Sequence, residues 1–481
     1  MDKRIEKLID LSQKFADLIT TKPIFVFAGF FALIAIILLT TTRAAGPFAG
    51  LEPELGAVTD PAIVQADTQA SGGEYVEFGD AIAPPLECTQ TVTSGANLND
   101  LLSNANDGDV ICLNNGDYGT LTIDAQRTGY ATIKSVNQSQ AVFSEIIFNN
   151  ARYIRLVGLK VNTEIRNNRD DTSHIELIAN DVTGIRADTS SGGAGVTDWL
   201  IAYNDVHDCD NMCIDINGGT TEGAYVPISN FVVRGNKIGP MGAGEDAIRM
   251  PNFNTVTIED NEIFGVIEDG QHNDCLQTVW GGQNITYRRN YLHDNNCQSF
   301  FIKDGYVTGV TVEDNLSLRN REGVPQEVVA FIYQSKDVTI SNNTWWDDGG
   351  FILRKGYYDA RFTTGPVENY NITNNVFEYY APYDEDANSG DRAGVFTDQN
   401  NVFHDYNLIC AGWTWVPTFL GPHSIENCSP NFVNPTTNRA DDLASGDYRL
   451  SGTVSGGGES YTPGITWELA GRKFGIEAYS P

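Results

Sequence analysis

Short runs of alternating apolar and polar residues recur through most of the chain, and nearly all carry Asn at the sixth position. Alternation with a period of two is typical of a half-buried β-strand, so each run predicts a strand that ends in a turn. The nine clearest runs are "IRLVGLKV" (154–161), "IELIANDV" (175–182), "WLIAYNDV" (199–206), "FVVRGNKI" (231–238), "VTIEDNEI" (256–263), "ITYRRNYL" (285–292), "VTVEDNLS" (310–317), "VTISNNTW" (338–345) and "YNITNNVF" (370–377).

The sixth positions follow one another at intervals of 22 to 32 residues. A repeat of this length holds short strands and has no room for a long helix, which predicts a β-solenoid. Asn tolerates the left-handed backbone conformation, so a repeated Asn at a strand end predicts a corner between two sheets, where stacked Asn side chains can hydrogen-bond along the axis. The positions are Gly158, Asn180, Asn204, Asn236, Asn261, Asn290, Asn315, Asn343 and Asn375.

A second strand is predicted after the corner of each coil. Its apolar positions Ile214, Ile248, Leu276 and Phe300 should face inward, and the positions between them should face outward on one sheet, about 5 Å apart per coil. The segments are "NMCIDING" (211–218), "GEDAIRMP" (244–251), "HNDCLQTV" (272–279), "CQSFFIKDG" (297–305) and "GGFILRKG" (349–356).

Three features together resemble the right-handed parallel β-helix of the pectate-lyase-like superfamily. They are the stretch "LNDLLSNANDGDVICLNNGDYGTLTI" (98–123), the strand repeat, and the ending "GDYRLSG" (446–452) with "AGRKFGIEAYSP" (470–481). The resemblance implies an all-β solenoid of about ten coils, with a short capping helix at its start and a closing segment at its end. That superfamily includes lyases, hydrolases, epimerases and non-catalytic adhesins, so the fold leaves the chemistry open.

The N-terminus predicts a membrane anchor. Residues 24–39 read "IFVFAGFFALIAIILL", and with their neighbours they approach the length of about 20 residues that a helical span needs. Five basic residues precede this stretch and only Arg43 closely follows it, which places the N-terminus inside. We therefore expect a cytosolic tail (1–22), a transmembrane signal-anchor (23–42), a linker (43–86) and the β-helix domain (87–481); a cleaved signal peptide is the alternative.

Charge and cysteine content narrow the location and the partners. The net charge of −32 argues against binding to nucleic acid or to an anionic membrane surface. Eight cysteines fit an oxidising compartment at the cell surface, in the periplasm or in the secreted fraction. Proximity in the sequence suggests the pairs Cys88–Cys112, Cys275–Cys297 and Cys410–Cys428.

The outward positions of the second strands form a candidate groove along the solenoid axis. It is predicted to contain Asp215, Asp246, Arg249, His272, Asp274, Gln277 and Lys303. A groove along the axis suits an extended polysaccharide. In a lyase acting on a uronate polymer, Lys303 or His272 could be the base and Arg249 the neutralising group or acid. Ca²⁺ held by Asp215, Asp246 or Asp274 could bridge the acidic protein to the polymer.

Glycoside hydrolysis is the second possible chemistry. "NMCIDING" and "GEDAIRM" resemble the paired acidic motifs of polygalacturonases, which implies Glu245, Asp246 and Asp210 or Asp215 as acid and base. An inverting pair needs carboxyl groups about 6.5–9.5 Å apart. Trp413 and Trp415, in "CAGWTWVPTFLGPHSIENC" (410–428), are candidates for stacking on sugar rings. The alternative to an enzyme is a non-catalytic glycan-binding adhesin or a structural surface solenoid.

Overall fold

The computed structural model separates into two compact units, Leu86–Ser480 and Met1–Pro85 with Pro481. The structure describes residues 62–66, 74–78, 86–168, 172–189, 196–219, 228–242, 246–267, 273–320, 328–332, 335–355, 365–384, 401–410 and 421–479. In the first unit, β1 (Ala62–Ala66) and β2 (Glu74–Phe78) form an antiparallel pair. The predicted membrane span 23–42 lies outside the described residues. Within the described ranges, the search for long apolar helices able to span a membrane finds none.

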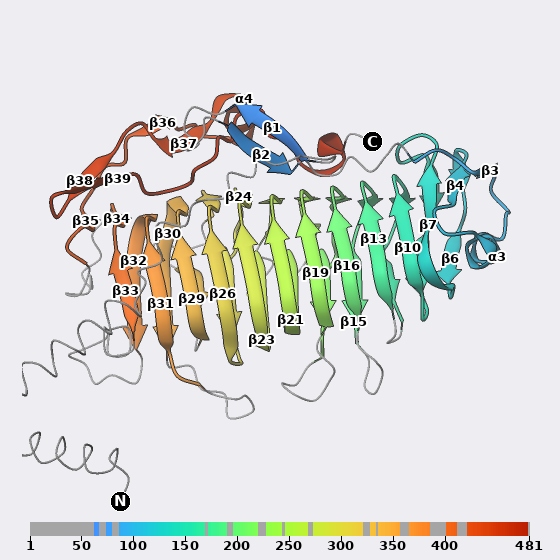
Figure 1. Ribbon diagram of the computed structural model, residues 1–481, viewed down its shortest axis with the longest axis horizontal. Coiled ribbons are helices and arrows are strands. Elements are labelled where there is room, and N and C mark those ends of the chain that lie inside the picture. Colours follow the sequence, from blue (N-terminus) through green and yellow to red (C-terminus); the bar gives the residue numbers. More distant parts are fainter. Residues whose placement is uncertain are drawn as a thin grey trace, which may run out of the picture. The chain divides into compact units, whose positions relative to one another are not determined.

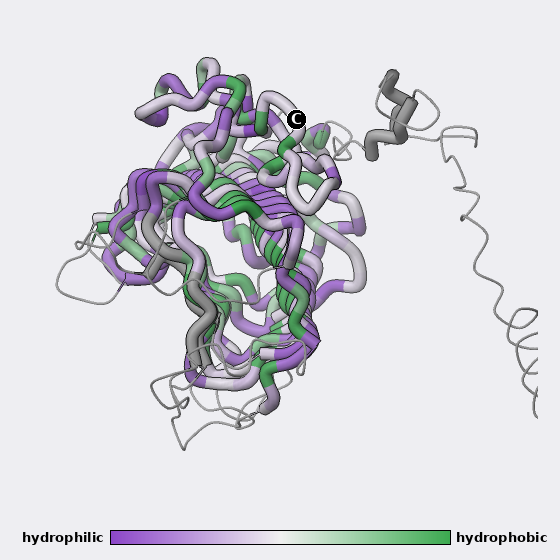
Figure 2. The backbone as a smooth tube through the Cα atoms, turned by 90° about the vertical axis from the view of Figure 1, so that its left-hand side faces the viewer, coloured by the Kyte–Doolittle hydropathy of each residue, from purple (hydrophilic) through white to green (hydrophobic). Residues whose placement is uncertain are grey.

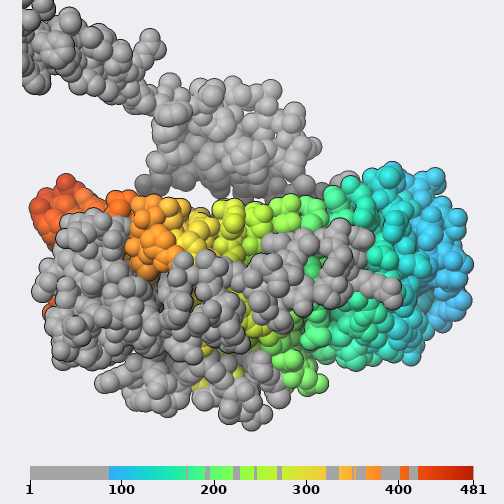
Figure 3. Space-filling view, turned by 90° about the horizontal axis from the view of Figure 1, so that it is seen from below, coloured from blue at the N-terminus to red at the C-terminus, as the bar shows by residue number. Residues whose placement is uncertain are grey.

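The second unit is a parallel β-solenoid of about ten turns, which confirms the predicted fold class (Figure 1). Its strands hydrogen-bond into one continuous 33-stranded system in which each coil pairs in parallel with the next. Seen from the end, successive coils follow the same path (Figure 2), and seen from below they are stacked in sequence order along the long axis (Figure 3). The right-handedness of the coil stays a prediction.

A typical coil contributes one strand to each of three sheets, here called sheet 1, sheet 2 and sheet 3. Sheet 1 contains the strands predicted from the repeat. Its members are β3 (Gln90–Val92), β4 (Val110–Leu113), β7 (Gln126–Ser135), β10 (Arg152–Val157), β13 (Ser173–Ile178), β16 (Thr197–Ala202), β19 (Ile228–Arg234), the ends of β21 (Ile248–Glu259) and β23 (Leu276–Arg288), β26 (Val307–Glu313), β29 (Ser335–Ser341), β31 (Glu368–Thr373) and β33 (Val402–Asp405).

Sheet 2 consists of the short strands that follow the corner. They are β5 (Gly116–Asp117), β8 (Ala141–Phe143), β11 (Lys160–Val161), β14 (Asp181–Val182), β17 (Asp205–Val206), β20 (Lys237–Ile238), β22 (Glu262–Phe264), β24 (Tyr291–His293), β27 (Leu316–Leu318), the starts of β30 (Thr344–Lys355) and β32 (Val376–Asp384), β34 (Leu408–Ile409) and β35 (Ile425–Glu426).

Sheet 3 consists of the second strands predicted above. They are β6 (Thr120–Ile123), β9 (Glu145–Phe148), β12 (Ile165–Asn167), β15 (Ile185–Asp188), β18 (Ile214–Asn217), the starts of β21 and β23, β25 (Phe300–Lys303), β28 (Val328–Ile332) and the ends of β30 and β32.

The core fills the inside of the coil. The inward positions predicted in sheet 3, Ile214, Ile248, Leu276 and Phe300, are all buried in one continuous apolar cluster. The N-terminal end is closed by α3 (Leu98–Asn104), the capping helix that the resemblance implied. This helix begins after Asn97, whose side chain accepts a hydrogen bond from the backbone N–H of Asp100, and it buries Leu98 and Leu102 against the first coils.

A buried asparagine ladder forms the corner between sheets 1 and 2, as predicted. At each step the side-chain Nδ2 and the backbone N–H of one Asn donate to the Oδ1 of the next; for Asn290 and Asn315 the distances are 3.0 and 3.1 Å. The members are Asn180, Asn204, Asn236, Asn261, Asn290, Asn315, Asn343, Asn375 and Asn407, all 0% exposed.

The left-handed residue at this corner is not the ladder Asn but the residue before it. Ala179, Asp260, Arg289 and Asn374 all have φ between 51° and 58°. The ladder Asn needs its side chain directed inward to reach the next coil, so the chain reverses one residue earlier, at a position whose side chain takes no part in the ladder. This is why the preceding position varies in type while the Asn does not.

A second, shorter ladder lies between sheets 2 and 3 and ends in an acid. Asn295 donates to Asn320 at 2.9 Å, and the backbone N–H of Asn320 donates to Asp348 Oδ1 at 2.8 Å. Asp348 is 0% exposed, and its Oδ2 has no hydrogen-bond partner among the described residues. Burial raises the pKa of the Asp348 carboxyl well above its usual range.

Replacing Asp348 with Asn is expected to stabilise the protein by about 1–3 kcal/mol at neutral pH. The new amide would donate to the preceding coil, as Asn320 donates to Leu292 O. Because the folded pKa of Asp348 is raised, its carboxyl costs stability as the pH rises above its unfolded value of about 3.9. The gain in denaturant melts should therefore increase from about pH 4 to pH 7. Asp347→Asn is the matched control, and a gain that does not depend on pH would contradict this account.

The C-terminal segment runs back over sheet 2 and covers its outer side (Figure 1). It comprises β36 (Phe432–Asn434), α4 (Arg439–Ser445), β37 (Asp447–Leu450), β38 (Val454–Gly456), β39 (Glu459–Tyr461) and a 3₁₀ helix (Gly475–Ala478); we call residues 432–479 the strap. Its far end reaches the early coils, where the backbone N–H of Gly475 donates to Gly235 O at 2.7 Å and that of Ile476 to Asp205 Oδ1 at 3.2 Å.

Buried charges join the strap to sheet 2. Arg439 of the strap donates to Glu262, which is 0% exposed and also lies 3.0 Å from His293 Nε2. Burial alone would raise the pKa of Glu262, but the hydrogen bonds from His293 and Arg439 outweigh it and lower the pKa. One coil beyond His293, Arg319 donates to Asp442 of α4 at 2.7 Å.

Four disulfides cross-link the solenoid. Cys88–Cys112, Cys275–Cys297 and Cys410–Cys428 confirm the pairs suggested by proximity, and Cys209–Cys213 is the fourth. They account for all eight cysteines. Two of the bridges lie at the entrance to sheet 3, because Cys213 and Cys275 each directly precede one of its strands.

Candidate functional site

Charged side chains form rows on two of the sheets. On sheet 1, Glu259 lies between Arg234 and Arg288 of the neighbouring coils. The strap runs over the outer side of sheet 2. On sheet 3, residues in register in successive coils form a row with three guanidinium groups. This row consists of Arg166, Arg186, Asp215, Arg249, Gln277 and Phe301.

Asp215 is held between two arginines of the neighbouring coils. Nε and Nη2 of Arg249 donate to its two carboxylate oxygens, each at 3.2 Å, and Arg186 Nε lies 3.7 Å from Oδ2 on the other side. The side chain of Asp215 is 5% exposed, that of Arg249 19% and that of Arg186 39%. Asp215 therefore orients the arginines and presents almost none of its own surface to solvent.

Both arginines keep donors that Asp215 does not use. A guanidinium has five N–H donors, and Arg249 spends two of them on Asp215. The side chain of Arg186 is 39% exposed, and its Nε, 3.7 Å from Asp215 Oδ2, is too far away to donate a hydrogen bond to that oxygen. The two groups are thus positioned to bind an anion that approaches sheet 3 from outside.

A shallow depression of about 280 Å³ lies at the N-terminal end of the row. Arg166 is fixed there by two carboxylates, with Nε 2.6 Å from Glu145 and 3.0 Å from Glu164. Arg186 and Asp188 also line the depression. The depression therefore combines exposed cationic donors with carboxylate acceptors, a mixture that suits the carboxylates and hydroxyls of an acidic sugar.

Sequence reasoning missed Arg166 and Arg186, although a signal was present. The stretches "EIRNN" (164–168) and "GIRAD" (184–188) have the same apolar–polar order as "CIDIN" (213–217) and "AIRMP" (247–251). The predicted set of second strands began at residue 211, so two earlier coils of the same sheet were left out.

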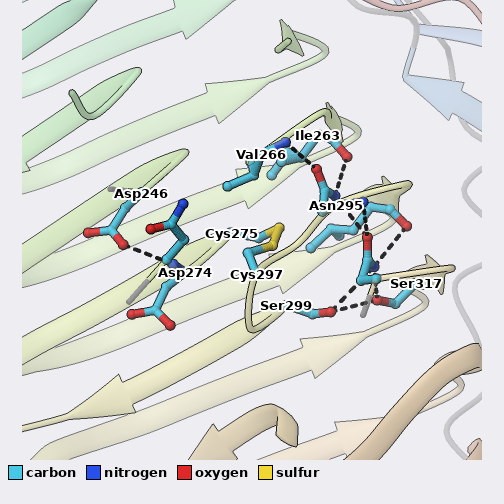
Figure 4. Close-up of a disulfide and its surroundings, with 12 residues drawn as sticks. Asp246, Ile263, Val266, Asp274, Cys275, Asn295, Cys297, Ser299 and Ser317 are labelled. Atoms are coloured by element: carbon cyan, nitrogen blue, oxygen red, sulfur yellow. Dashed lines mark hydrogen bonds between the residues drawn. A yellow bond between two sulfur atoms is a disulfide. The ribbon is translucent and has the colours of Figure 1, made fainter. Parts of the chain in front are cut away.

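Asp246 and Asp274 were expected to line the groove but are 1% and 0% exposed. The two carboxylates occupy matching positions at the corner that leads into sheet 3, one coil apart. Figure 4 shows the Asp246 carboxylate directed at the backbone of Asp274, whose N–H donates to Asp246 Oδ1 at 3.0 Å. The chain turns here, so side chains that precede the strand face into the corner rather than outward.

The C-terminal end of the row is less polar. Phe301 faces outward by register but is 4% exposed. Lys303 Nζ lies 5.6 Å from the centroid of the Phe301 ring and 3.8 Å from Asp304 Oδ2. Gln277 lies between this end and Arg249, and its Nε2 donates to Asp274 Oδ2 at 2.7 Å.

Four predicted site residues, Glu245, His272, Trp413 and Trp415, lie outside the described residues. In the described ranges, no group of three or more His, Cys, Asp and Glu side chains could hold a metal ion. Asp215 is engaged by arginines, and Asp246 and Asp274 by hydrogen bonds within the protein. These three carboxylates do not converge as a Ca²⁺ site requires.

No protein-family model and no curated protein sequence matches the chain. Several solved structures do match it. The PL6 family polysaccharide lyase Pedsa3628 from Pseudopedobacter saltans is 13% identical with a TM-score of 0.42, covering 81% of this chain and 99% of that one. A mannuronic acid specific family 6 lyase from human gut microbiota is 13% identical with a TM-score of 0.42, covering 70% and 91%. Pectate lyase Pel9A is 11% identical with a TM-score of 0.29, covering 58% and 80%. At these values the similarity says nothing of a shared activity.

Proposed function

We propose that this protein binds an extended acidic polysaccharide along the outer side of sheet 3 and cleaves it by β-elimination. The observation that supports the proposal is the row of Arg166, Arg186 and Arg249, in register on one partly exposed face of a chain whose net charge is −32. Guanidinium groups pair with carboxylates through two parallel hydrogen bonds. Successive coils lie about 4.8 Å apart, so a polymer extended along the axis would meet one outward position per coil.

β-Elimination assigns roles to Arg249, within the row, and to Lys303, two coils beyond it. Arg249 would neutralise the carboxylate of a uronate and so acidify the proton on the adjacent C5. Lys303, in its neutral form, would take that proton, and His272 is the other candidate. The C4–O4 bond would then break, a C4=C5 double bond would form, and the leaving oxygen would receive a proton. Lys303 lies two coils beyond Arg249, about 10 Å along the axis, a gap that two long side chains and one sugar can close.

Hydrolysis by paired carboxylates is supported less well by the same residues. Asp246 and Asp274 are buried and bonded within the protein, and Asp215 is neutralised by two arginines. None of the three offers an exposed carboxyl to a glycosidic oxygen, as an acid or base must.

The four disulfides support a location outside the cytoplasm. We also propose that residues 23–42 anchor the protein in a membrane, since residues 24–39 are all apolar or Gly. An anchored protein would act on polymers near the cell surface.

The test is a screen of the full chain on alginate, polygalacturonate and hyaluronan, with dextran as the neutral control, with Ca²⁺ and with a chelator. We expect the ultraviolet absorbance of an unsaturated uronate and the number of reducing ends to rise together on at least one acidic polymer. Reducing ends without that absorbance would replace elimination by hydrolysis. Binding with neither signal would make the protein a glycan-binding rod. Loss of activity in chelator would show that Ca²⁺ takes part.

Arg249→Ala is expected to lower kcat/KM by about 10²-fold or more, the usual effect of removing a group that stabilises charge in the transition state. The matched control is Arg288→Ala, because Arg288 also pairs with a carboxylate of the neighbouring coil, Glu259, but lies on sheet 1. The control should keep full activity in the same assay. Equal losses in the two variants would show that the effect comes from stability and not from sheet 3.

A further inference from the structure

Two buried carboxylates and one amide form a chain of hydrogen bonds that ends on the outer side of sheet 3. Asp246 Oδ1 accepts the backbone N–H of Asp274 at 3.0 Å, and Asp274 Oδ2 accepts Nε2 of Gln277 at 2.7 Å. Asp246 and Asp274 are 1% and 0% exposed, whereas Gln277 is partly exposed. The chain therefore fixes a surface side chain from below, through groups that solvent does not reach.

The consequence is a defined orientation of the Gln277 amide. In this hydrogen bond the nitrogen of the amide faces Asp274 and the oxygen faces away from it. Among the described residues, Gln277 makes no other side-chain hydrogen bond. Its Oε1 is thus an acceptor that no donor of the described residues occupies.

Gln277 lies in register with Arg249, one coil away. At a coil spacing of about 4.8 Å, an anion-binding group and a hydrogen-bond acceptor stand side by side on the same row. A single uronate residue carries the complementary pair, because its carboxylate accepts from a guanidinium and its ring hydroxyls donate.

We propose that Gln277 Oε1 accepts a hydrogen bond from a free ring hydroxyl of the uronate whose carboxylate Arg249 holds. The site would then select uronate polymers with unmodified hydroxyls over the same polymers carrying O-acetyl groups. An acetylated oxygen has no proton to donate, and it leaves Oε1 unpaired while adding bulk beside it. This inference rests on the proposed function. Gln277 is the specificity-determining residue, and Asp274 and Asp246 are its positioning residues.

The experiment compares alginate, polygalacturonate and hyaluronan, each unmodified and chemically O-acetylated, for binding and for cleavage by the full chain. We expect a preference of about tenfold for the unmodified polymer, the scale of one net hydrogen bond. Gln277→Met keeps the length of the side chain and removes the acceptor. This variant should weaken binding of the unmodified polymer by about tenfold and leave binding of the acetylated polymer unchanged, so that the preference disappears.

Two further variants distinguish the orientation of the Gln277 amide by Asp274 from a general effect on the stability of the fold. Asp274→Asn keeps the shape of the buried group but lets it donate to Gln277, so the amide can reverse and the preference should fall with little change in melting temperature. Gln283→Met is the matched control, because Gln283 lies on the same strand β23 but is exposed on sheet 1; it should keep the preference.

The outcomes distinguish this inference from the proposed function. If an unmodified polymer binds and Gln277→Met leaves the preference intact, the role of Gln277 is overturned while polysaccharide binding stands. If the wild-type chain binds none of the three acidic polymers, both are overturned. Binding without cleavage tests the preference equally well, because the ratio of dissociation constants replaces the ratio of kcat/KM.

Discussion

Asp442→Ala is expected to lower the free energy of unfolding by about 3–5 kcal/mol, the usual cost of removing one member of a buried ion pair. Asp442 lies in α4 and is 0% exposed. Its carboxylate accepts from Arg319 Nη2 at 2.7 Å and from the Tyr448 hydroxyl at 3.1 Å, and also from the hydroxyls of Tyr291 and Thr436. Removing it would leave the hydroxyl of Tyr291 without its partner. Arg319 would keep only Asp294, and the Tyr448 hydroxyl only the carbonyl of Thr436.

The measurement is a denaturant melt combined with limited proteolysis. Because the lost contacts join the strap to the coils, proteases should cut the variant first within residues 432–479, before the solenoid unfolds. Asp441→Ala is the matched control, since Asp441 is the preceding residue of the same helix and is exposed. The control should change the free energy of unfolding by about 0.5 kcal/mol. Equal effects of the two variants would mean that the network contributes nothing beyond helix capping.

Asn290→Ala, in the middle of the long ladder, is expected to cost about 3–5 kcal/mol, because it leaves more than one buried polar group unpaired. Asn290 Oδ1 accepts from Asn261, and its Nδ2 donates to Ile258 O at 2.8 Å and to Asn315 Oδ1 at 3.0 Å. The truncated side chain would leave donors and acceptors of three coils without partners. Every member of the ladder is 0% exposed, so bulk solvent does not reach these groups in the intact ladder.

A second asparagine supplies the control for this variant. Asn369 also bonds from coil to coil, donating to Asp337 Oδ1 at 2.7 Å and accepting from Asn401 at 2.8 Å, but these hydrogen bonds are exposed to solvent. Asn369→Ala should cost about 1 kcal/mol, because water can satisfy the exposed groups while the left-handed backbone at Asn369 (φ 60°) disfavours Ala. A comparable loss in both variants would place the stabilisation in the repeat geometry and not in burial.

The repeat made the fold predictable because it acts locally and many times. Each strand, corner and ladder Asn could be read from a run of eight residues, and the short loops between paired cysteines indicated three of the disulfides. The left-handed position was assigned one residue too late, because the sequence marks the invariant Asn and not the variable residue before it, such as Ala179 or Arg289.

The candidate site was less predictable because it depends on burial at the corners. Asp215, Arg249 and Gln277 could be assigned to one outward row by alternation alone. Asp246 and Asp274 could not, since alternation stops where the chain turns, and an acid at that point bonds inward. Arg166 and Arg186 could have been found by extending the repeat two coils toward the N-terminus.

The direction of the strap has a consequence for how the chain is made. Its contact between Ile476 and Asp205 spans 271 residues, and the contact between Arg439 and Glu262 spans 177, while neighbouring coils are joined by contacts of 21 to 35 residues. Contacts distant in sequence close late in folding. Coils can therefore assemble one after another as the chain leaves the ribosome or crosses a membrane. The strap, synthesised last, docks only on a finished stack, so a chain cut short before it would carry complete coils whose sheet 2 stays uncovered and open to aggregation.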